Sequence, residues 1–454
     1  MTLFFSKLKN KIDHISVLKK IAYSFVLVIL TGAVLLMLPV SSRSGQWTPF
    51  LTALFTSTTS TCVTGLVVVD TYTYWSIFGQ LVILAMIQIG GVGFITLAIS
   101  ALTLTKKKIG LRQRLAAKEV SGSTQVGGVV KTTRFIIFGT LTVEFIGAVL
   151  LSFYFIPKLG IIKGIYFAVF HSVSAFCNAG LDLMSRFNYG SSLMTVQSDF
   201  LFISTVSALI VLGGLGFLVW EDLIRCRLRF RRFRLHTKLV VTTTLLLIIG
   251  GALLIFLLEN NGKAFENLDM GSKVLASFFQ SITTRTAGFF SVDLPSLRES
   301  TILIMCILML IGGSPGSTAG GIKTTSFAVL FMSIFLVFRN KENVECFKRR
   351  ISKDALYSAC CLLMLFFAMI ITSTAIISYV DGIPVLYSLF ECTSAMATVG
   401  LSMGITADLS VVSKMIIITL MYIGRVGALT TLMSFAKKGG FVQSKYIEEK
   451  ITIG

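Results

Sequence analysis

A pattern of twelve residues occurs four times in the chain, and it limits the possible folds more than any other feature. In each copy a Phe stands ten residues before a Gly, and mainly small or hydroxylated residues lie between them. The copies read FTSTTSTCVTGL (55–66), FHSVSAFCNAGL (170–181), FFQSITTRTAGF (278–289) and FECTSAMATVGL (390–401). Their glycines, Gly65, Gly180, Gly288 and Gly400, are 115, 108 and 112 residues apart. This regular spacing indicates an internal repeat of one structural unit.

A second string with glycines follows each copy and supports the repeat. The strings are IGGVG (89–93), LGGLG (212–216), IGGSPG (311–316) and IGRVG (423–427). The first glycine of each string lies 25, 33, 24 and 24 residues after the glycine of the preceding copy. The longer interval in the second unit predicts an insertion in its loop at 182–198.

The composition indicates that these units lie in a membrane. Hydrophobic residues make up 54% of the 454 residues and charged residues only 14%, which is typical of a polytopic membrane protein. Apolar stretches that we expect to cross a bilayer occupy 21–40, 76–104, 134–156, 200–220, 239–258, 300–313, 355–379 and 411–436. The sequence therefore predicts an all-α polytopic membrane protein with eight spanning helices.

The positive charges of the chain predict its orientation. Lys and Arg number 41 against 21 Asp and Glu, which gives a net charge of +20. The charges fall in five blocks, with two apolar stretches between successive blocks: Lys7 to Lys20, Lys106 to Lys118, Arg225 to Lys238, Arg339 to Lys353, and the tail from Lys437. Because basic loops stay on the cytoplasmic side, we expect all five blocks and both termini in the cytoplasm. The lipid bilayer thus accounts for the charge, and no nucleic-acid partner is expected.

The segment from Phe to Gly in each unit is too short to cross a bilayer. As a helix of ten residues it would span about 15 Å, against about 30 Å of hydrocarbon. A half-crossing helix followed by extended chain fits this length. Extended chain at membrane depth is tolerated only where it is buried in protein or lines a water-filled cavity. Each unit is therefore expected to hold a spanning helix, a pore helix, a filter strand and a second spanning helix.

The basic blocks separate the four units, so all units are predicted to share one orientation. Parallel repeats related by an axis along the membrane normal can enclose one pseudo-fourfold pore. The partly negative C-terminal ends of the pore helices would favour a cation there. The predicted units are 1–118, which includes the basic leader, 119–232, 233–350 and 351–436, and 437–454 is a cytoplasmic tail.

The repeated glycine is the candidate centre of an ion filter. A filter whose carbonyl groups all face an ion alternates backbone conformations that Gly adopts most easily, and Thr398-Val399-Gly400 resembles the first half of the TVGYG loop of potassium channels. The candidate filter residues are Thr64, Gly65, Asn178, Ala179, Gly180, Thr286, Ala287, Gly288, Thr398, Val399 and Gly400, with a cation on the carbonyl groups of the four glycines. A glycine that only allows close helix packing is the alternative, and it explains one copy better than four in register.

Together these motifs resemble the Trk/Ktr/HKT superfamily of potassium transporters, and most closely the membrane subunit of the bacterial Ktr systems. The resemblance rests on TCVTGL, CNAGL, RTAGF, ATVGL and GGSPGSTAGGIKTT and covers nearly the whole chain. It implies K⁺ uptake across the bacterial plasma membrane through one pore per subunit of a homodimer, and many members of the superfamily depend on Na⁺. It also implies a cytoplasmic nucleotide-binding ring as regulatory subunit. Some members carry Ser at the first filter position and pass sodium, so Gly65 implies a preference for potassium.

The third unit contains the candidate gate. Its second helix is interrupted by IGGSPGSTAGGIKTT (311–325), whose glycines and proline cannot hold a regular helix. Broken helix at membrane depth must line a cavity, and the resemblance implies a loop that obstructs the pore below the filter. A flexible kink without a gating function is the alternative. The candidate gate residues are Gly312, Gly313, Ser314, Pro315, Gly316, Ser317, Thr318, Ala319, Gly320, Gly321 and Lys323, together with Arg425.

Arg425 stands out because it occupies the position that Gly has in the other three units, at 91, 214 and 313. A charge inside an apolar helix is costly, so Arg425 is expected to face the pore or a partner. The resemblance places it beneath the filter, near the gate loop. There its charge would repel potassium, and its guanidinium could pair with carbonyl groups of the loop.

Four further charged residues carry weaker expectations. Asp70 and Asp293 each follow a filter glycine by five residues, where a carboxylate either concentrates cations or stabilises the loop. Arg285 is expected to tie a pore helix to a loop. Glu144, within an apolar stretch, is expected to pair inside the helix bundle, although the sequence does not identify its partner.

Other functional classes fit the chain less well. Paired carboxylates, nucleophile–base sets and metal-ligand spacings do not emerge from the sequence, so neither an enzyme nor a bound cofactor is expected. A sodium- or proton-coupled carrier of another solute would need more ionisable residues within the spans. That carrier, a less selective sodium/potassium channel, and a membrane sensor without transport are the alternatives to potassium uptake.

Overall fold

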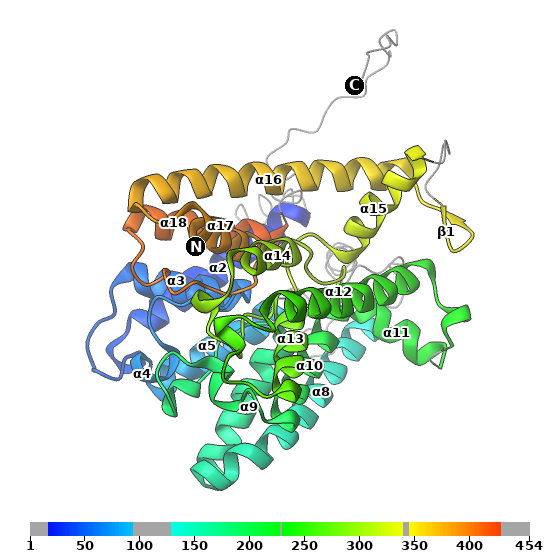
Figure 1. Cartoon of the computed structure of the whole chain (residues 1–454). Helices are drawn as coiled ribbons and strands as arrows, with labels where there is room; N and C mark the ends of the chain where they lie inside the picture. The colour runs from blue at the N-terminus through cyan, green and yellow to red at the C-terminus, as the bar shows by residue number, and fades with distance from the viewer. Residues whose placement is uncertain (1–16, 94–128, 228, 339–344, 428–454) are drawn as a thin grey trace, which may run out of the picture.

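The computed structural model describes residues 17–93, 129–227, 229–338 and 345–427, which are almost entirely helical (Figure 1). The predicted all-α class is therefore confirmed. Each unit contributes three main helices: α2 (Val17–Met37), α3 (Phe50–Cys62) and α5 (Ile77–Val92); α8 (Val129–Leu159), α9 (Ile161–Cys177) and α10 (Phe200–Leu215); α12 (Leu235–Glu259), α13 (Met270–Thr283) and α14 (Glu299–Leu310); and α16 (Lys353–Asp381), α17 (Val385–Ala397) and α18 (Val411–Val426). Residues 1–16 of the leader, the block Lys106 to Lys118 and the tail at 437–454 lie outside the described residues.

Shorter elements connect these helices. The α-helical ones are α4 (Thr71–Tyr74), α11 (Phe217–Arg225) and α15 (Thr324–Phe338). The 3₁₀ helices are η1 (Pro39–Ser41), η2 (Met184–Arg186), η3 (Ser192–Val196), η4 (Phe230–Arg232), η5 (Lys263–Phe265) and η6 (Leu294–Ser296). Two strands, β1 (Glu345–Cys346) and β2 (Arg349–Arg350), pair antiparallel in a small hairpin before α16.

The four units contact one another in a closed circle. The third main helix of each unit contacts the middle one, the short helix, of the next unit: α5 with α9, α10 with α13, α14 with α17, and α18 with α3. The fourth unit thereby returns to the first. The buried apolar side chains follow the same order, because one cluster joins the first, second and third units, one joins the third and fourth, and one joins mainly the fourth and first.

Three helices of the described chain are long and apolar enough to cross a membrane: Lys131–Leu159, Leu235–Glu259 and Lys353–Asp381. A fourth is added if α10 and α11, which meet at 94°, are counted as one bent span. The remaining apolar helices are shorter, so the predicted eight spans and the pseudo-fourfold pore stay predictions. Large apolar side chains such as Phe138, Phe145 and Phe153 on α8 are exposed, as expected of a surface that faces lipid.

The glycine string that follows the repeated motif ends a helix in the first, second and fourth units. Its last glycine has φ in the left-handed region, 90° at Gly93, 89° at Gly216, 69° at Gly316 and 96° at Gly427. A residue with a Cβ rarely adopts that conformation, and α5, α10 and α18 each stop directly before it. In the second unit a described helix, α11, follows the glycine, so the interruption that the sequence indicated for the third unit has a counterpart there. In the third unit α14 ends earlier, at Leu310, and extended chain follows.

The first glycine of the same strings allows close helix packing in three of the units. A Cβ at this glycine would collide with a backbone carbonyl oxygen of the short helix, four residues before the repeated glycine. The pairs are Gly90 with Thr61, Gly213 with Phe176, and Gly424 with Met396. In the third unit Gly312 instead meets the carbonyl oxygen of Gly320, within the extended segment.

Candidate functional site

The four repeated glycines meet at one place in the structure. Each glycine faces the carbonyl oxygen of the residue before the glycine of the next unit, so closely that a Cβ would collide with it. A Cβ on Gly65 would lie 2.6 Å from the oxygen of Ala179, one on Gly180 2.7 Å from that of Ala287, one on Gly288 2.7 Å from that of Val399, and one on Gly400 would overlap that of Thr64. The contacts run in chain order and close on themselves, so these eight residues form a ring.

The backbone of the ring alternates in conformation. The residue two before each glycine is left-handed, with φ of 56° at Val63, 60° at Asn178, 72° at Thr286 and 53° at Thr398. The residue between is not, and the glycine again has positive φ, from 63° to 102°. Three of these four left-handed residues carry β-branched side chains. Left-handed backbone costs about 1–3 kcal/mol at each such residue and persists only where the surrounding structure enforces it. Val63 precedes the ring in the first unit, and the sequence did not indicate its role.

Hydroxyl groups of the short helices hold the ring from behind. In the first and fourth units the glycine N–H donates to a hydroxyl six residues earlier: Gly65 to Thr59 Oγ1 at 2.9 Å and Gly400 to Ser394 Oγ at 3.0 Å. In the other two units the hydroxyl donates to the carbonyl oxygen just after the glycine, from Ser174 to Leu181 at 2.6 Å and from Thr283 to Phe289. These bonds explain why hydroxylated residues recur between Phe and Gly.

Two further side chains brace the chain that leaves the ring. His171 and Glu391 both stand nine residues before their glycines, in the second and fourth units. The Nδ1 of His171 lies 2.7 Å from the carbonyl oxygen of Phe167, so Nδ1 carries the proton and Nε2 accepts from Leu183 N–H at 3.3 Å. Glu391 Oε1 accepts from the hydroxyl of Thr406. Sequence patterns could not indicate these roles, because Leu183 and Thr406 belong to loops that fold back onto the short helices.

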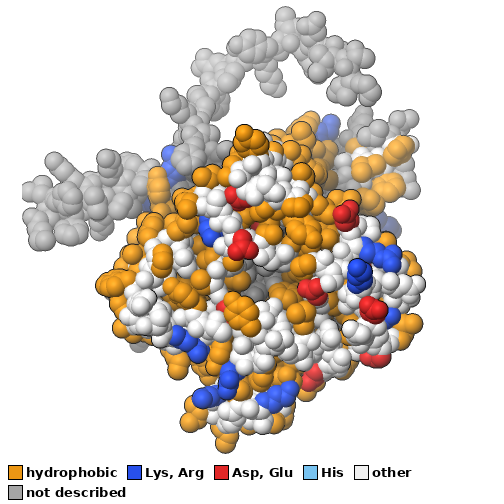
Figure 2. Space-filling model, turned by 60° about the vertical axis from the view of Figure 1, so that its left-hand side comes forward, with side chains coloured by type: hydrophobic (Ala, Val, Ile, Leu, Met, Phe, Trp, Pro, Cys, Tyr) orange, Lys and Arg blue, Asp and Glu red, His pale blue; other side chains and the backbone are white. Residues whose placement is uncertain are grey.

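A cavity of about 360 Å³ opens on one side of the ring. It is lined by the four glycines and by the residues that follow them, and Figure 2 shows the hollow face with acidic side chains near it. Asp70 and Asp182 contribute carboxylates to its wall. Burial raises the pKa of Asp182 to about 6, and the nearby carboxylate of Asp70 adds to the rise. Asp293 bonds to Ser296 in its own loop, which fits the loop-stabilising alternative.

The interrupted segment of the third unit is fixed to the second unit. Ser314 N–H donates to Gly214 O at 3.0 Å, and Thr318 N–H donates to Gly213 O at 3.3 Å. In return, Phe217 N–H donates to Gly316 O at 2.9 Å. All three bonds use backbone that the break between α10 and α11 exposes. The segment therefore occupies hydrogen-bonding groups that a continuous helix would satisfy internally.

The same segment lies against the ring and contacts Arg425. A Cβ on Gly320 would overlap the hydroxyl of Thr398 and lie 3.1 Å from Ala397 O. The guanidinium of Arg425 on α18 donates to Thr318 O in the segment and to Gly90 O at the end of α5. One side chain of the fourth unit thus bridges the third and first units.

The other predicted gate and support residues have separate partners. Lys323 Nζ donates to Ala319 O at 2.7 Å, within the segment, and Arg285 Nη2 lies 3.4 Å from Gly312 O. Arg285 therefore connects its short helix to the segment, as the sequence indicated. Glu144 is buried, and its Oε2 accepts from Gln88 Nε2 on α5 at 3.2 Å. This amide is the partner that the sequence left open.

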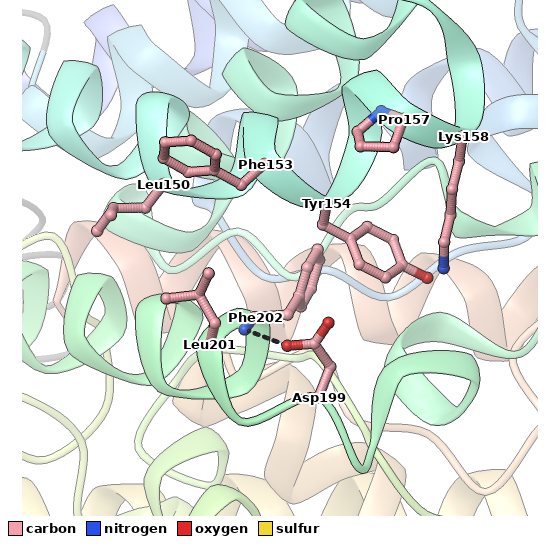
Figure 3. Close-up of a pocket in the computed structure, with 8 residues that line it drawn as sticks. All are labelled: Leu150, Phe153, Tyr154, Pro157, Lys158, Asp199, Leu201 and Phe202. Atoms are coloured by element: carbon pink, nitrogen blue, oxygen red, sulfur yellow. Dashed lines mark hydrogen bonds between the residues drawn. The ribbon is translucent and has the colours of Figure 1, made fainter.

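A second surface pocket of about 260 Å³ lies between the end of α8 and the start of α10, away from the ring (Figure 3). Its walls are mostly apolar, and its polar groups have structural roles. Asp199 caps α10 by accepting from Phe202 N–H at 3.0 Å, and Lys158 Nζ stacks 3.7 Å from the ring centroid of Tyr154. We therefore place the candidate site at the glycine ring.

Comparison with known proteins places the chain among cation transporters. The TrkH family model, described as a cation transport protein, matches residues 6–444. The Potassium/sodium uptake protein NtpJ of Enterococcus hirae is 39% identical over 460 residues, which cover 100% of both chains. The Ktr system potassium uptake protein B of Bacillus subtilis is 39% identical over 419 residues, 92% of each chain.

A solved structure shares the fold. The potassium transporter TrkH from Vibrio parahaemolyticus superposes with a TM-score of 0.70 at 16% identity, over 91% of this chain and 85% of that chain. The resemblance inferred from the repeated motifs is thereby confirmed, and so is the expectation that the chain is a transporter of ions and not an enzyme. The chain belongs to the TrkH family of cation transport proteins.

Proposed function

We propose that this protein is the pore-forming subunit of a potassium uptake system in the bacterial plasma membrane. The closed ring of four glycines is the observation that carries the proposal. Rings of backbone carbonyl groups can replace the hydration shell of an ion, and the ring here is made of backbone from four units. The names of the relatives, which refer to potassium or potassium/sodium uptake, support this choice of ion.

In this proposal the ring is the selectivity filter. The filter residues are Thr64, Gly65, Asn178, Ala179, Gly180, Thr286, Ala287, Gly288, Thr398, Val399 and Gly400, to which we add Val63. The carbonyl groups of the four glycines bind K⁺, and the short helices end at the ring, so their partly negative ends favour a cation. The hydrogen bonds that Thr59 and Ser394 accept from Gly65 N–H and Gly400 N–H hold these two strands against their short helices.

The segment 312–321, with Lys323 and Arg425, is proposed as the gate. Its support is its position against Thr398 and its bonds to the carbonyl groups of Gly213 and Gly214. Because the bonds to backbone and to Arg425 are few and separate, the segment can leave without unfolding a helix. Opening therefore consists of breaking these contacts while the filter stays in place.

The larger architecture is proposed from the family and the basic blocks. We infer eight spans, four parallel units within 1–118, 119–232, 233–350 and 351–436, and both termini in the cytoplasm. A homodimer and a cytoplasmic nucleotide-binding ring as regulatory partner complete the assembly. The name of the Bacillus subtilis relative, which refers to a Ktr system, supports a multisubunit arrangement.

A less selective pathway for both sodium and potassium is the second candidate. It is favoured by the name of the Enterococcus hirae relative, potassium/sodium uptake protein. The two candidates differ in whether sodium itself passes through the ring or only modulates the flux of potassium.

Both candidates can be tested in a bacterium that lacks its own potassium uptake systems. Expression of the chain with a Ktr-type regulatory subunit is expected to restore growth at low external potassium and to drive potassium accumulation. Simultaneous measurement of ²²Na⁺ entry separates the candidates. Failure of a membrane-inserted, partner-bound protein to restore growth or accumulation would contradict the proposal.

A further inference from the structure

Two of the basic blocks, far apart in the sequence, are brought together by aromatic side chains. Phe230 of η4 and Phe347 of the β1–β2 hairpin have ring centroids 5.9 Å apart at an interplanar angle of 72°. The ammonium group of Lys238 lies 5.7 Å from the first ring centroid and 5.6 Å from the second. Figure 1 shows α11 and β1 at the same end of the molecule, opposite α4. The fold thus builds one surface from two loops.

We call this surface the basic platform. Its exposed cations are Arg225, Arg227, Arg229, Arg231, Arg232, Arg234, Lys348, Arg349, Arg350 and Lys353. The carboxylates of the same loops are fewer than the cations: Asp222 lies 3.9 Å from Arg234, Glu345 pairs in register with Arg350 across the hairpin, and Glu221 and Asp354 are exposed. Asp222 is itself buried and accepts a hydrogen bond from Arg234 N–H at 2.9 Å. Its carboxylate therefore stabilises the loop and adds little negative charge to the exposed surface. The platform is therefore strongly positive.

Exposed apolar side chains surround these cations. Ile224 is 67% exposed, Phe338 81% and Tyr357 65%. The break of 94° after α10 turns α11 out of the direction of the spanning helix and toward the platform. Arginine beside exposed aromatic and aliphatic side chains is typical of surfaces that sit in the membrane interface. An acidic soluble partner would account for the charges but not for these side chains.

We propose that the basic platform binds the phosphate headgroups of anionic phospholipids in the cytoplasmic leaflet. The proposal rests on the proposed function and on its orientation, which puts these loops on the cytoplasmic side. The positive-inside rule requires basic loops there, but not that two of them share an aromatic contact beside exposed apolar side chains. Clusters of four to eight cations at the cytoplasmic end of a spanning helix are known to attract anionic lipids.

The platform is connected directly to the proposed gate. The hairpin lies on the chain that follows α15, and α15 begins at Thr324, immediately after Lys323. Helix α15 also contacts α12 and α16, which start at the platform. Headgroups bound to the platform would therefore fix the far ends of the helices that hold the interrupted segment. Anionic lipid is thus expected to regulate opening.

The test uses the full-length protein purified in a neutral detergent. Phosphatidylglycerol or phosphatidylcholine is titrated in mixed micelles, and the melting temperature and the retained lipid phosphorus are measured. The variant Arg232→Gln/Arg349→Gln/Arg350→Gln is compared with Lys163→Gln/Arg186→Gln/Lys263→Gln, three exposed cations of α9, η2 and η5. Phe230→Ala separates the loops without changing any charge.

We expect phosphatidylglycerol, but not phosphatidylcholine, to raise the melting temperature and remain bound. The platform variant should need about a hundredfold more phosphatidylglycerol for the same shift, as expected when three cations near the lipid surface are lost. Phe230→Ala should lie between the platform variant and the native protein. Equal shifts with both lipids, or equal loss in the control variant, would overturn the proposal. A platform variant that keeps its lipid but releases an acidic protein partner would overturn it as well. Because lipid binding is measured on purified protein without transport, a failure of the uptake assay can be distinguished from a failure of lipid binding.

Discussion

At the residue scale, the glycine ring depends on side chains that a linear pattern cannot reveal. The repeated Phe and Gly identify where each ring strand lies. The brace from His171 to Leu183 and the brace from Glu391 to Thr406 exist only because loops fold back onto short helices. Val63 is left-handed despite its β-branched side chain, and only the folded ring enforces that conformation.

Loss of the Glu391 brace is expected to reduce ion selectivity. Glu391→Ala removes one acceptor of the Thr406 hydroxyl and leaves Ser402 Oγ, at 2.9 Å, as its remaining partner. The loop thereby loses its bond to the short helix, at a cost of about 0.5–1.5 kcal/mol. Glu391→Gln keeps an acceptor in the same place and should retain most of the selectivity. The measurement is the ratio of potassium to sodium uptake in cells. Equal ratios in both variants and the native protein would contradict the role.

Potassium uptake at low external potassium is expected to weaken as the outside pH falls through about 6. Asp182 lines the cavity, and burial raises its pKa to about 6. Above that pH the carboxylate is charged and concentrates cations, whereas below it the group is protonated and the attraction is lost. Asp182→Asn should show the weaker apparent affinity at all pH values, with the step near pH 6 gone. A step that persists in this variant would assign the titration to another group.

At the element scale, the second glycine strings explain how each second helix packs and ends. Gly90, Gly213 and Gly424 allow contact with a short helix, and the last glycine of the same three strings stops the helix. The sequence showed the strings and their spacing. It did not show that these three helices end at the glycine, because an apolar run continues past it in the first, second and fourth units.

Gly424→Ala is expected to destabilise the protein, because its Cβ would overlap the carbonyl oxygen of Met396. Backbone cannot move aside cheaply, so a loss of roughly 1–3 kcal/mol is expected, as in overpacked cores. Gly250→Ala on α12 is the matched control, since a Cβ there meets nothing within 4 Å. It should be neutral or stabilise by about 0.5–1 kcal/mol. Melting temperatures of the two purified variants provide the comparison, and similar values would contradict this packing account.

Arg425→Ala is expected to raise the maximal rate of potassium uptake severalfold. The substitution removes the donors to Thr318 O and Gly90 O, so the interrupted segment loses its connection to α5 and α18. Arg425→Lys, which keeps the charge but not the planar geometry, should give an intermediate rate. Initial rates of potassium uptake over a range of concentrations provide the measurement. Unchanged maximal rate and apparent affinity in Arg425→Ala would contradict the gate role.

At the scale of the whole molecule, the contacts between units close into a circle, and the molecule carries different features in different places. The cavity with Asp70 and Asp182 lies on one side of the ring, and the basic platform lies at the end opposite α4. The family could be predicted from the motifs, and the repeated Phe and Gly indicated which segments meet at the glycine ring. The contacts between units could not, because they join backbone carbonyl groups to glycines, and any residue type supplies a carbonyl.

The most direct test of the account is the ion selectivity of Gly65→Ser, measured as ²²Na⁺ against ⁸⁶Rb⁺ uptake in cells that lack other potassium uptake systems. Gly65 has φ of 102°, and a Cβ would lie 2.6 Å from Ala179 O, so serine must distort the ring. Gly250→Ser, at an open position on α12, is the control. The account predicts that Gly65→Ser loses its preference for Rb⁺ and admits Na⁺, while the control keeps the native ratio. A native ratio in a well-expressed Gly65→Ser protein would contradict the assignment of the glycine ring as the filter.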